Sequence, residues 1–475
     1  MHAGNRPEAS AGNATSSELS DIPASHALRR DGAVGLHVSV KHPSAATAPP
    51  PADIATERRL CRRLAWQVLP VLMLAYLAAY IDRTNVSFAS LQLHGQLGFS
   101  DAVFGFGAGV FSLGYVVFEL PSNMILQRVG ARIWLTRIIL VWGAVTALTV
   151  LVSTSKQFYV MRYLLGIAEA GLVPGIVYYI ARSFPYHYRA RMLSTFYAAL
   201  PLSGVIGAPA AGFILQYFDG AMHVPGWKWM LIVESLPAFL AASFCWWRLD
   251  DDVTTSTRYS TEDRARLVSA LARSRSSSES IHPDQIYSSP LVLAFGALYF
   301  LDVFGIYGYT LWAPTIVHSL GVSGDLRIGL ITVLPNLVAI AVMIAVGRNA
   351  DKTRSRRLHV AALLFVAALG LALAAALHQH LWLSVMGLCI ANACLLSVPP
   401  VFWSMPITVL GPASAANGIA WISAIGNLGG FFGPYTVGHL KQSSGSLLAP
   451  VMTMIGCLLL GVVLTMLLPK RLVDG

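Results

Sequence analysis

Charged residues are scarce in this chain: they make up 12% of its 475 residues, whereas soluble domains carry about 25%. Hydrophobic residues make up 55%, so a soluble enzyme and a fibrous or wholly disordered protein are both excluded. Cysteine is also scarce. The five cysteines show neither metal-ligand nor redox spacing, so we expect no disulfide framework and no metal site. The apolar residues form blocks near the roughly 20 residues that cross a bilayer as a helix, which predicts an all-α integral membrane protein.

The first 58 residues lack the apolar run of a secretory signal and are rich in Ala, Ser and Pro. We predict that residues 1–58 are a disordered cytoplasmic tail. A start codon assigned too far upstream is the alternative explanation.

Twelve apolar segments follow this tail. A polar stretch at 249–288 divides them into six and six, so we predict an N-terminal half (59–248), a cytoplasmic central loop (249–288) and a C-terminal half (289–475). The predicted spans are 64–92, 103–126, 133–152, 157–183, 192–217, 227–248, 289–319, 327–347, 358–377, 381–409, 415–440 and 447–469.

The net charge of +10 fits a positive-inside topology, so we expect no nucleic-acid partner. Twelve basic residues fall in the loops of one side and four in the loops of the other, which predicts that both termini and the central loop are cytoplasmic. The twelve are Arg128, Arg132, Arg182, Arg189, Arg191, Arg348, Lys352, Arg354, Arg356, Arg357, Lys470 and Arg471, and the four are Lys156, Lys228, Arg327 and Lys441.

Two short basic loops occupy matching positions in the halves. The first contains Arg128 and Arg132, and the second contains Asp351 and Lys352. Each loop resembles the signature loop of the major facilitator superfamily, whose Asp and Arg groups lock neighbouring helix ends in one conformation, and this resemblance implies the same role for both loops. The first loop has Gln127 in place of an acid, so a charge lock there stays open, and plain positive-inside loops are the alternative reading.

Several charged residues lie inside predicted spans, where each costs at least about 2.5–3.5 kcal/mol and is a functional candidate. Arg162 and Glu169 are seven residues apart, so they share one helix face. Asp82 and Arg83 lie in the outer half of the first span, at a similar depth. We expect a mixed-charge site in which arginines hold a carboxylate substrate and buried acids carry a proton. Structural salt bridges are the alternative.

Other polar residues in the spans have less certain roles. Glu119, Arg137 and Glu234 lie near span ends, where a structural role is the expected one, whereas Asp302 is as well suited to binding substrate as to packing. Helix packing or interface anchoring also competes with substrate binding for the remaining candidates. These are Tyr80, Tyr115, Tyr309 and Trp312, whereas Asn427 is the exception, because an amide inside a span needs a hydrogen-bond partner and is as well suited to facing substrate as not.

Five strings together resemble one family, the anion:cation symporters of the major facilitator superfamily, over residues of about 58–470. The family includes permeases for phthalate, tartrate, hydroxyphenylacetate and hexonates. The strings are Tyr80-Ile-Asp82-Arg83-Thr-Asn85, Gly114-Tyr115-Val-Val-Phe118-Glu119, Arg162-Tyr-Leu-Leu-Gly166-Ile-Ala-Glu169, Gly226-Trp227-Lys-Trp229 with Glu234, and Gly426-Asn427-Leu-Gly429-Gly430.

The resemblance implies twelve transmembrane helices in the major facilitator fold, and roles for matching positions. It implies that Asp82 and Glu169 carry protons, that Arg83 and Arg162 bind the anion or pair with these acids, and that Tyr115 and Asn427 contact substrate. Asp302 matches no element of the family pattern.

We therefore expect an inner-membrane secondary transporter, not an enzyme, that imports a small organic anion by proton symport. We expect no cofactor besides the proton, and a monomer embedded in lipid. A proton-coupled exporter of organic anions or drugs is the first alternative, and a non-transporting membrane sensor is the second. The identity of the anion, the coupling ion and the direction of transport stay open.

Overall fold

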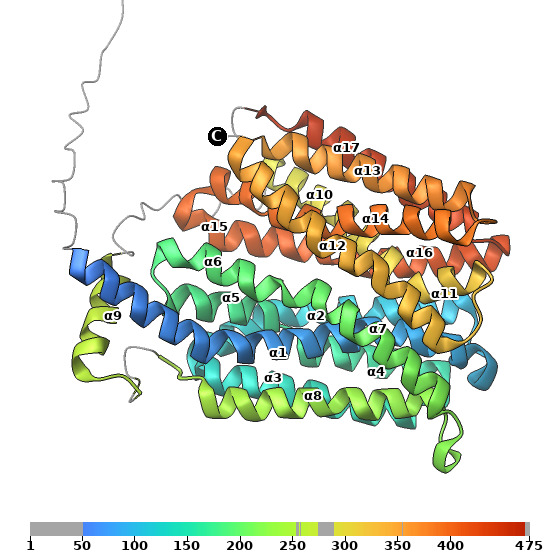
Figure 1. Cartoon of the computed structure of the whole chain (residues 1–475), viewed down its shortest axis with the longest axis horizontal. Coiled ribbons are helices and arrows are strands. Elements are labelled where there is room, and N and C mark those ends of the chain that lie inside the picture. Colours follow the sequence, from blue (N-terminus) through green and yellow to red (C-terminus); the bar gives the residue numbers. More distant parts are fainter. Residues whose placement is uncertain (1–50, 253–255, 257, 274–288, 354, 471–475) are drawn as a thin grey trace, which may run out of the picture. The chain divides into compact units, whose positions relative to one another are not determined.

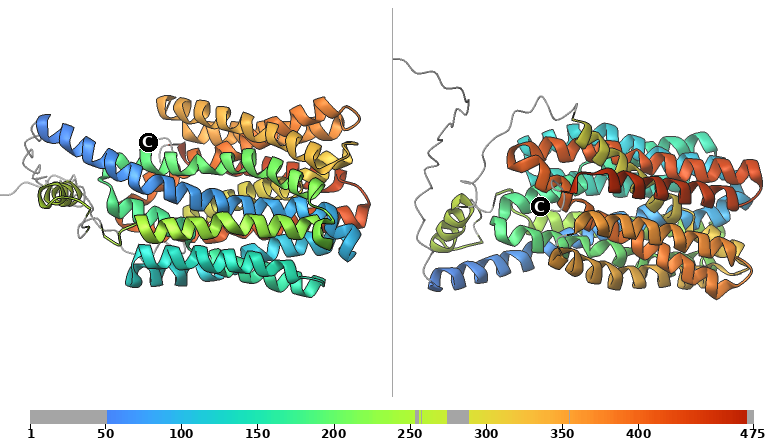
Figure 2. Two further views of the ribbon diagram at one scale, coloured as in Figure 1. Left: turned by 60° about the horizontal axis from the view of Figure 1, so that its bottom comes forward. Right: turned by 90° about the horizontal axis from the view of Figure 1, so that it is seen from above.

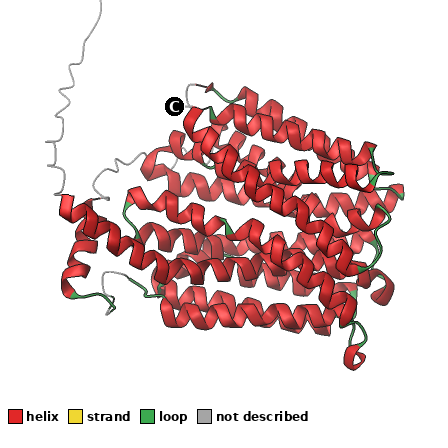
Figure 3. Cartoon of the chain, viewed as in Figure 1, coloured by secondary structure: helices red, strands yellow, loops and turns green. Residues whose placement is uncertain are grey.

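Helices account for every regular element in the part of the chain that the structure describes (Figure 3). This computed structural model describes residues 51–470, apart from 253–255, 257, 274–288 and 354. The side chains of 51–55, 186–187, 190, 351, 407–408 and 411–417 also lie outside the description. Most of the predicted tail, and part of the predicted central loop, therefore lie outside the described residues.

The N-terminal half contains six membrane crossings, of which the fourth and the fifth are each made of two helices. Its helices are α1 (Pro51–Leu97), α2 (Asp101–Val129), α3 (Ala131–Leu148), α4 (Ser155–Glu169), α5 (Leu172–Ser183), α6 (Tyr186–Tyr197), α7 (Ala199–Tyr217) and α8 (Gly226–Arg248), with short 3-10 turns η1 (Thr149–Leu151) and η2 (Ala221–His223).

A short polar helix, α9 (Thr261–Arg273), separates the halves in sequence (Figure 1). The C-terminal half contains α10 (Pro290–Thr310), α11 (Ala313–Ser319), α12 (Asp325–Thr353), α13 (Arg356–Ala376), α14 (Leu381–Phe402), α15 (Ser404–Asn427), α16 (Gly429–Ser444) and α17 (Leu448–Leu467).

Length and composition confirm that the chain crosses the membrane many times. Within the described residues, eleven helical segments are long and apolar enough to cross a bilayer. The end of α15 together with α16 supplies the twelfth crossing expected from the sequence. Many large apolar side chains remain exposed on these helices, as expected where lipid replaces water as the solvent.

The two halves contact each other along two helix pairs, α7 with α12 and α2 with α16. Figures 1 and 2 show these helices running side by side between the halves. Small residues make the approach possible: a Cβ added at Gly105 would lie 2.5 Å from the carbonyl oxygen of Pro434, and one at Gly212 would lie 2.4 Å from that of Asp325. Small residues at such positions let helix backbones pack closely in a membrane.

The bundle has two ends, which we name by residues of α2. At the Asp101 end, α1 stops at Leu97 and α2 begins with Ser100 as its N-cap, whose side chain accepts from the N–H of Val103. At the Arg128 end, α2 stops at Val129 and α3 begins after Gly130. The close contacts between the halves, at Gly105 and Gly212, lie toward the Asp101 end.

Candidate functional site

A buried ion pair between α1 and α4 forms the centre of the candidate site. Arg83 Nε donates to Glu169 Oε1 at 2.8 Å, and Arg83 Nη2 lies 2.6 Å from the same oxygen. Glu169 is fully buried. It is the last residue of α4, and Gly171, at φ +88°, separates α4 from α5. This left-handed conformation favours glycine, so the break in the fourth crossing falls beside the acid.

Aromatic rings enclose the guanidinium of Arg83. Its central carbon lies 5.3 Å from the ring centre of Tyr80, 5.0 Å from that of Phe111 and 5.0 Å from that of Tyr115. These distances are those of cation–π contacts. The N-terminal half therefore presents a cation held by one carboxylate and three rings.

Arg83 also reaches the other half of the molecule. Its Nη1 donates to the hydroxyl of Tyr307 on α10 at 2.9 Å. The sequence places Tyr307 among the aromatic residues of the spans that could line a cavity, but no spacing rule pairs it with Arg83. Its position opposite Arg83 depends on how the two halves pack.

Asp82 and Arg162 form a second charged layer behind the first. Asp82 is buried, and its Oδ2 accepts a hydrogen bond from Trp142 Nε1 on α3 at 2.9 Å. Arg162 is also buried, and its guanidinium lies 5.1 Å from the ring centre of Phe111. Both residues line the same small void. The structure thus brings together all four charged residues that the sequence predicted to meet.

A third buried acid, Glu234 of α8, contacts α1 at Asn85, three residues after Asp82. Asn85 Nδ2 donates to Glu234 Oε1 on α8. Both side chains are buried, and α1 and α8 pack along their length. Since this contact lies within one half, it fits the structural role expected for Glu234.

Glu119 on α2 connects the two halves at the level of the central site. Ser423 Oγ and Asn427 Nδ2, both on α15, donate to its two carboxylate oxygens at 3.4 Å each. The sequence assigned Asn427 to substrate and Glu119 to structure, and it gave no sign that the two would meet. Asn427 therefore contacts an acid of the other half in this conformation.

The central cavity lies between the halves beside Arg83. Polar residues of both halves line it: Tyr80, Arg83, Thr84, Asn85, Ser203, Tyr307, Tyr309, Thr332, Asn336 and Asn392. Its volume is about 60 Å³, well below the roughly 300–1,000 Å³ of pockets that bury small organic ligands. The cavity must widen before it admits such a ligand.

Three predicted substrate residues differ in position. Tyr309 lines the central cavity. Trp312 does not: it is fully buried at the Asp101 end, where its Nε1 lies 3.4 Å from the carbonyl oxygen of Pro434. Asp302 is also fully buried, and neither of its oxygens has a hydrogen-bond partner among the described residues. The expectation that Trp312 and Asp302 face the cavity thus differs from the structure, because helix packing covers both.

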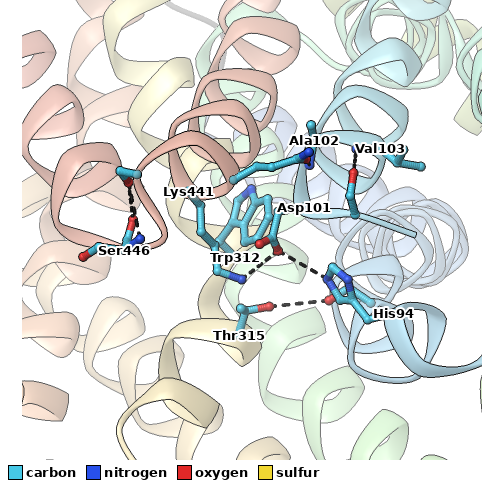
Figure 4. Close-up of polar contacts among 12 residues, drawn as sticks. His94, Asp101, Ala102, Val103, Trp312, Thr315, Lys441 and Ser446 are labelled. Atoms are coloured by element: carbon cyan, nitrogen blue, oxygen red, sulfur yellow. Dashed lines mark hydrogen bonds and ion pairs between the residues drawn. The ribbon is translucent and has the colours of Figure 1, made fainter. Parts of the chain in front are cut away.

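A polar cluster joins the halves at the Asp101 end (Figure 4). Asp101 Oδ1 lies 2.7 Å from Lys441 Nζ on α16 and 3.3 Å from His94 Nε2 on α1. Lys441 also lies 5.2 Å from the ring centre of Trp312. These contacts close the halves against each other at this end.

The two loops predicted to hold helix ends differ in the contacts that the structure describes for them. In the first loop, Asp251 Oδ1 accepts from the backbone N–H of Arg132 at 2.9 Å, and the Arg132 guanidinium lies 4.5 Å from the ring centre of Trp246. Arg182 also pairs with Asp252 at 2.8 Å. Acids that follow α8 thus supply the charge that Gln127 lacks. Sequence reasoning treated these acids only as part of a polar stretch.

The remaining loop residues make fewer contacts in the structure. Arg128 is exposed at the end of α2, and Lys352 is exposed near the end of α12. The side chain of Asp351 lies outside the described residues. A charge lock in the second loop therefore stays a prediction.

Known proteins resemble this chain over most of its length. The chain is 37% identical over 416 residues to a protein of Agrobacterium vitis that carries the name tartrate transporter, covering 87% of this chain and 92% of that one. It is 36% identical over 431 residues to the quinolone resistance transporter of Acinetobacter baumannii, covering 88% and 96%. The solved xylose transporter XylE of Escherichia coli has the same fold, with a TM-score of 0.69 at 16% identity over 86% of this chain and 98% of that chain.

The sequence profile of the Major Facilitator Superfamily matches residues 72–434. This range includes Asp82, Arg83, Arg162 and Glu169, and it contains α2, α7 and α12 and the first residues of α16. The family consists of transporters and not of enzymes, in agreement with the sequence-based expectation. The chain is a multi-pass membrane transporter and belongs to the Major Facilitator Superfamily.

Proposed function

We propose that this transporter imports a small organic anion together with protons. The single observation that carries this proposal is the buried contact of Arg83 with Glu169 beside the central cavity. An arginine fork binds a carboxylate substrate in the same way that it binds Glu169. The relative named for tartrate transport is consistent with an anionic cargo.

The geometry makes the proton and the substrate compete for one arginine. While Glu169 is ionised, it occupies two nitrogens of Arg83. A proton on Glu169 weakens this contact and leaves Arg83 available to a substrate carboxylate. Loading of the anion then requires a proton on Glu169, which is the requirement of symport.

Asp82 supplies a second proton position in this scheme. It lies in the layer behind Arg83 with Arg162, so a change in its charge alters the balance of two acids and two arginines. Its one described hydrogen bond comes from the neutral indole of Trp142. Asp82 can therefore gain a proton without losing that donor.

We further propose that the Arg128 end faces the cytoplasm of a cell whose inner membrane holds the protein. The excess of basic residues in the loops of that end supports this orientation. The cluster of His94, Asp101 and Lys441 would then close the outer end. Transport requires this cluster to open while the inner end closes, as in alternating access by two rocking halves.

Uptake into proteoliposomes tests the proposal. Labelled organic acids, including aromatic acids, dicarboxylates such as tartrate and sugar acids, are offered with an inward proton gradient. We expect one class to accumulate in the wild type and not in Glu169→Gln, while Glu234→Gln, which alters a buried acid outside the cavity, still accumulates it. Accumulation that Glu169→Gln leaves unchanged would contradict the proposal.

Export of organic anions or drugs by proton exchange is the second candidate. The similarity to the quinolone resistance transporter favours it. The same vesicles separate the two candidates, since an exporter would release preloaded cargo faster under a proton gradient across the membrane. A sodium gradient in place of the proton gradient identifies the coupling ion.

A further inference from the structure

A groove between α1 and α6 at the Arg128 end has no part in the site described above. Its volume is about 750 Å³, more than ten times that of the central cavity. Four arginines line it: Arg58, Arg59 and Arg62 from α1, and Arg191 from α6. Among the described residues, none of the four side chains forms a salt bridge or a hydrogen bond.

The groove reaches the surface at Trp66, whose side chain is 75% exposed, and it shares no lining residue with the central cavity. On the fifth crossing, Tyr188, Arg191 and Thr195 line the groove, whereas Leu200 lines the central cavity. Thr195 and Leu200 are five positions apart, so on a helix they point about 140° apart. The two hollows therefore lie on different faces of this crossing.

Neighbouring residues mark the depth of the groove in the membrane. Gln67 Nε2 of α1 donates to the carbonyl oxygen of Arg248 at 3.1 Å, so Gln67 is level with the end of α8. Three tryptophans near this level are exposed, Trp66 by 75%, Trp246 by 51% and Trp247 by 64%. Exposed tryptophans at helix ends are typical of the boundary between lipid and water.

The chemistry of the groove changes across this boundary. Arg58, Arg59 and Arg62 come before Gln67 in α1, on the water side, whereas Leu69, Pro70 and Met73 come after it, on the hydrocarbon side. From Arg58 to Met73 the helix rises about 22 Å. A basic end and an apolar end within one groove match a molecule that has an anionic head and a hydrocarbon tail.

We propose that this groove binds an anionic phospholipid, with its phosphate among the four arginines and an acyl chain along Leu69, Pro70 and Met73. Glu57 is the neighbouring acid on α1, so the lining keeps a net positive charge. The first 50 residues of the chain contain four basic and four acidic residues, so they offer no net negative charge to balance the arginines. Basic pockets between helices at the cytoplasmic side commonly bind anionic lipid head groups.

Native mass spectrometry of the full-length protein in detergent tests this proposal. Dioleoyl phosphatidylglycerol and dioleoyl phosphatidylcholine, which share acyl chains, are added in separate titrations. We expect the anionic lipid to remain bound to the wild type in preference to the zwitterionic one. We expect the double variant Arg62→Gln/Arg191→Gln to weaken its binding about 30-fold, roughly fivefold for each arginine removed.

The chain offers a control with the same loss of charge at the same end. Arg63 lies 5.4 Å from the ring centre of Tyr259, and Arg132 lies 4.5 Å from that of Trp246, so both point away from the groove. Burial raises the pKa of Tyr259 to about 12, and its neutral hydroxyl donates to Gln67 at 3.0 Å. Arg63→Gln/Arg132→Gln should change lipid binding by less than about twofold, since surface charge alone is then altered.

Two further arms complete the test. Arg62→Lys/Arg191→Lys keeps both charges, so its affinity for the lipid should stay within about threefold of that of the wild type. This result would show that the glutamine variant loses binding because it loses charge and not because it unfolds. Glycerol phosphate at millimolar concentration should leave the lipid bound. Displacement by glycerol phosphate, equal binding of both lipids, or equal losses in the two glutamine variants would each overturn the proposal.

Discussion

The two halves of this transporter carry their buried polar groups in different chemical forms. Among the side chains of the N-terminal half that the structure describes, six charged ones are buried: Asp82, Arg83, Glu119, Arg162, Glu169 and Glu234. In the C-terminal half, neutral amides and phenols line the central cavity, among them Asn336, Asn392, Tyr307 and Tyr309, and Asp302 is buried apart from them. The N-terminal half therefore holds buried acids and arginines, and the C-terminal half offers neutral hydrogen-bonding groups to the cavity.

This difference suggests that the two halves have different roles in the proposed symport. A proton that binds in the N-terminal half changes the charge of that half alone, and the change reaches the other half through two contacts. One is the hydrogen bond from Arg83 to Tyr307, and the other joins Glu119 to Ser423 and Asn427. Coupling between protonation and the rocking of the halves then depends on contacts that cross the interface.

The largest effect is expected from Arg83→Gln. The substitution leaves Glu169 buried without its cation, and breaking a buried ion pair costs about 3–5 kcal/mol. We therefore expect proton-driven uptake to fall at least about 100-fold and the thermal unfolding midpoint to fall with it. Arg137→Gln serves as control, since Arg137 is exposed in part and lies 4.6 Å from the ring centre of Trp134. Normal uptake by Arg83→Gln would remove this pair from the mechanism.

A smaller and more selective effect is expected from Asp82→Asn. The amide oxygen still accepts from Trp142, so the fold is retained, but the side chain no longer binds a proton. Under a gradient of about one pH unit, accumulation should fall about tenfold, because one coupled proton supplies about 1.4 kcal/mol, while exchange of labelled for unlabelled substrate at equal pH continues. Paired assays of accumulation and exchange on the same vesicles check this. Equal loss of both activities would indicate a structural role for Asp82.

Tyr307→Phe tests the contact between the halves. The change removes the hydroxyl that accepts a hydrogen bond from Arg83, and one such bond contributes about 1–1.4 kcal/mol net, while the ring keeps its size and shape. We expect the substrate concentration for half-maximal uptake to rise about fivefold to tenfold. Tyr309→Phe, on the same helix and lining the same cavity, should change it by less than about twofold. Equal effects of the two variants would remove the special role of Tyr307.

Much of this arrangement follows from local sequence. The apolar blocks determine the crossings because each must span the bilayer, and the charges inside them stand out because each is costly there. Asp82, Arg83, Arg162 and Glu169 could be predicted to meet, since depth along each helix can be counted from the loops. The break after Glu169 was not predicted, although Gly171 follows it.

Contacts between the halves could not be predicted in this way. The meeting of Glu119 with Asn427, and of Arg83 with Tyr307, depends on the relative position of two bundles, which no local pattern contains. The contact of Asp251 with the first loop, and that of Asp252 with Arg182 of α5, also depend on how the chain after α8 folds back onto earlier helices. The same reason explains why the position of Trp312 was not predicted. At the Asp101 end it contacts Pro434 and Lys441, which belong to a distant segment of the chain.

The smallest effect is expected from Asp302→Asn. An ionised carboxylate is too costly to bury without partners, and neither oxygen of Asp302 has one among the described residues. We infer that this acid is neutral, so an amide of the same size keeps both packing and charge. Uptake and the thermal unfolding midpoint should stay within about twofold and a few degrees of wild type. If Asp302→Asn instead lost accumulation as Asp82→Asn is expected to, an acid of the C-terminal half would also bind a transported proton. The two halves would then differ in where their acids lie, and not in whether they take part in proton coupling.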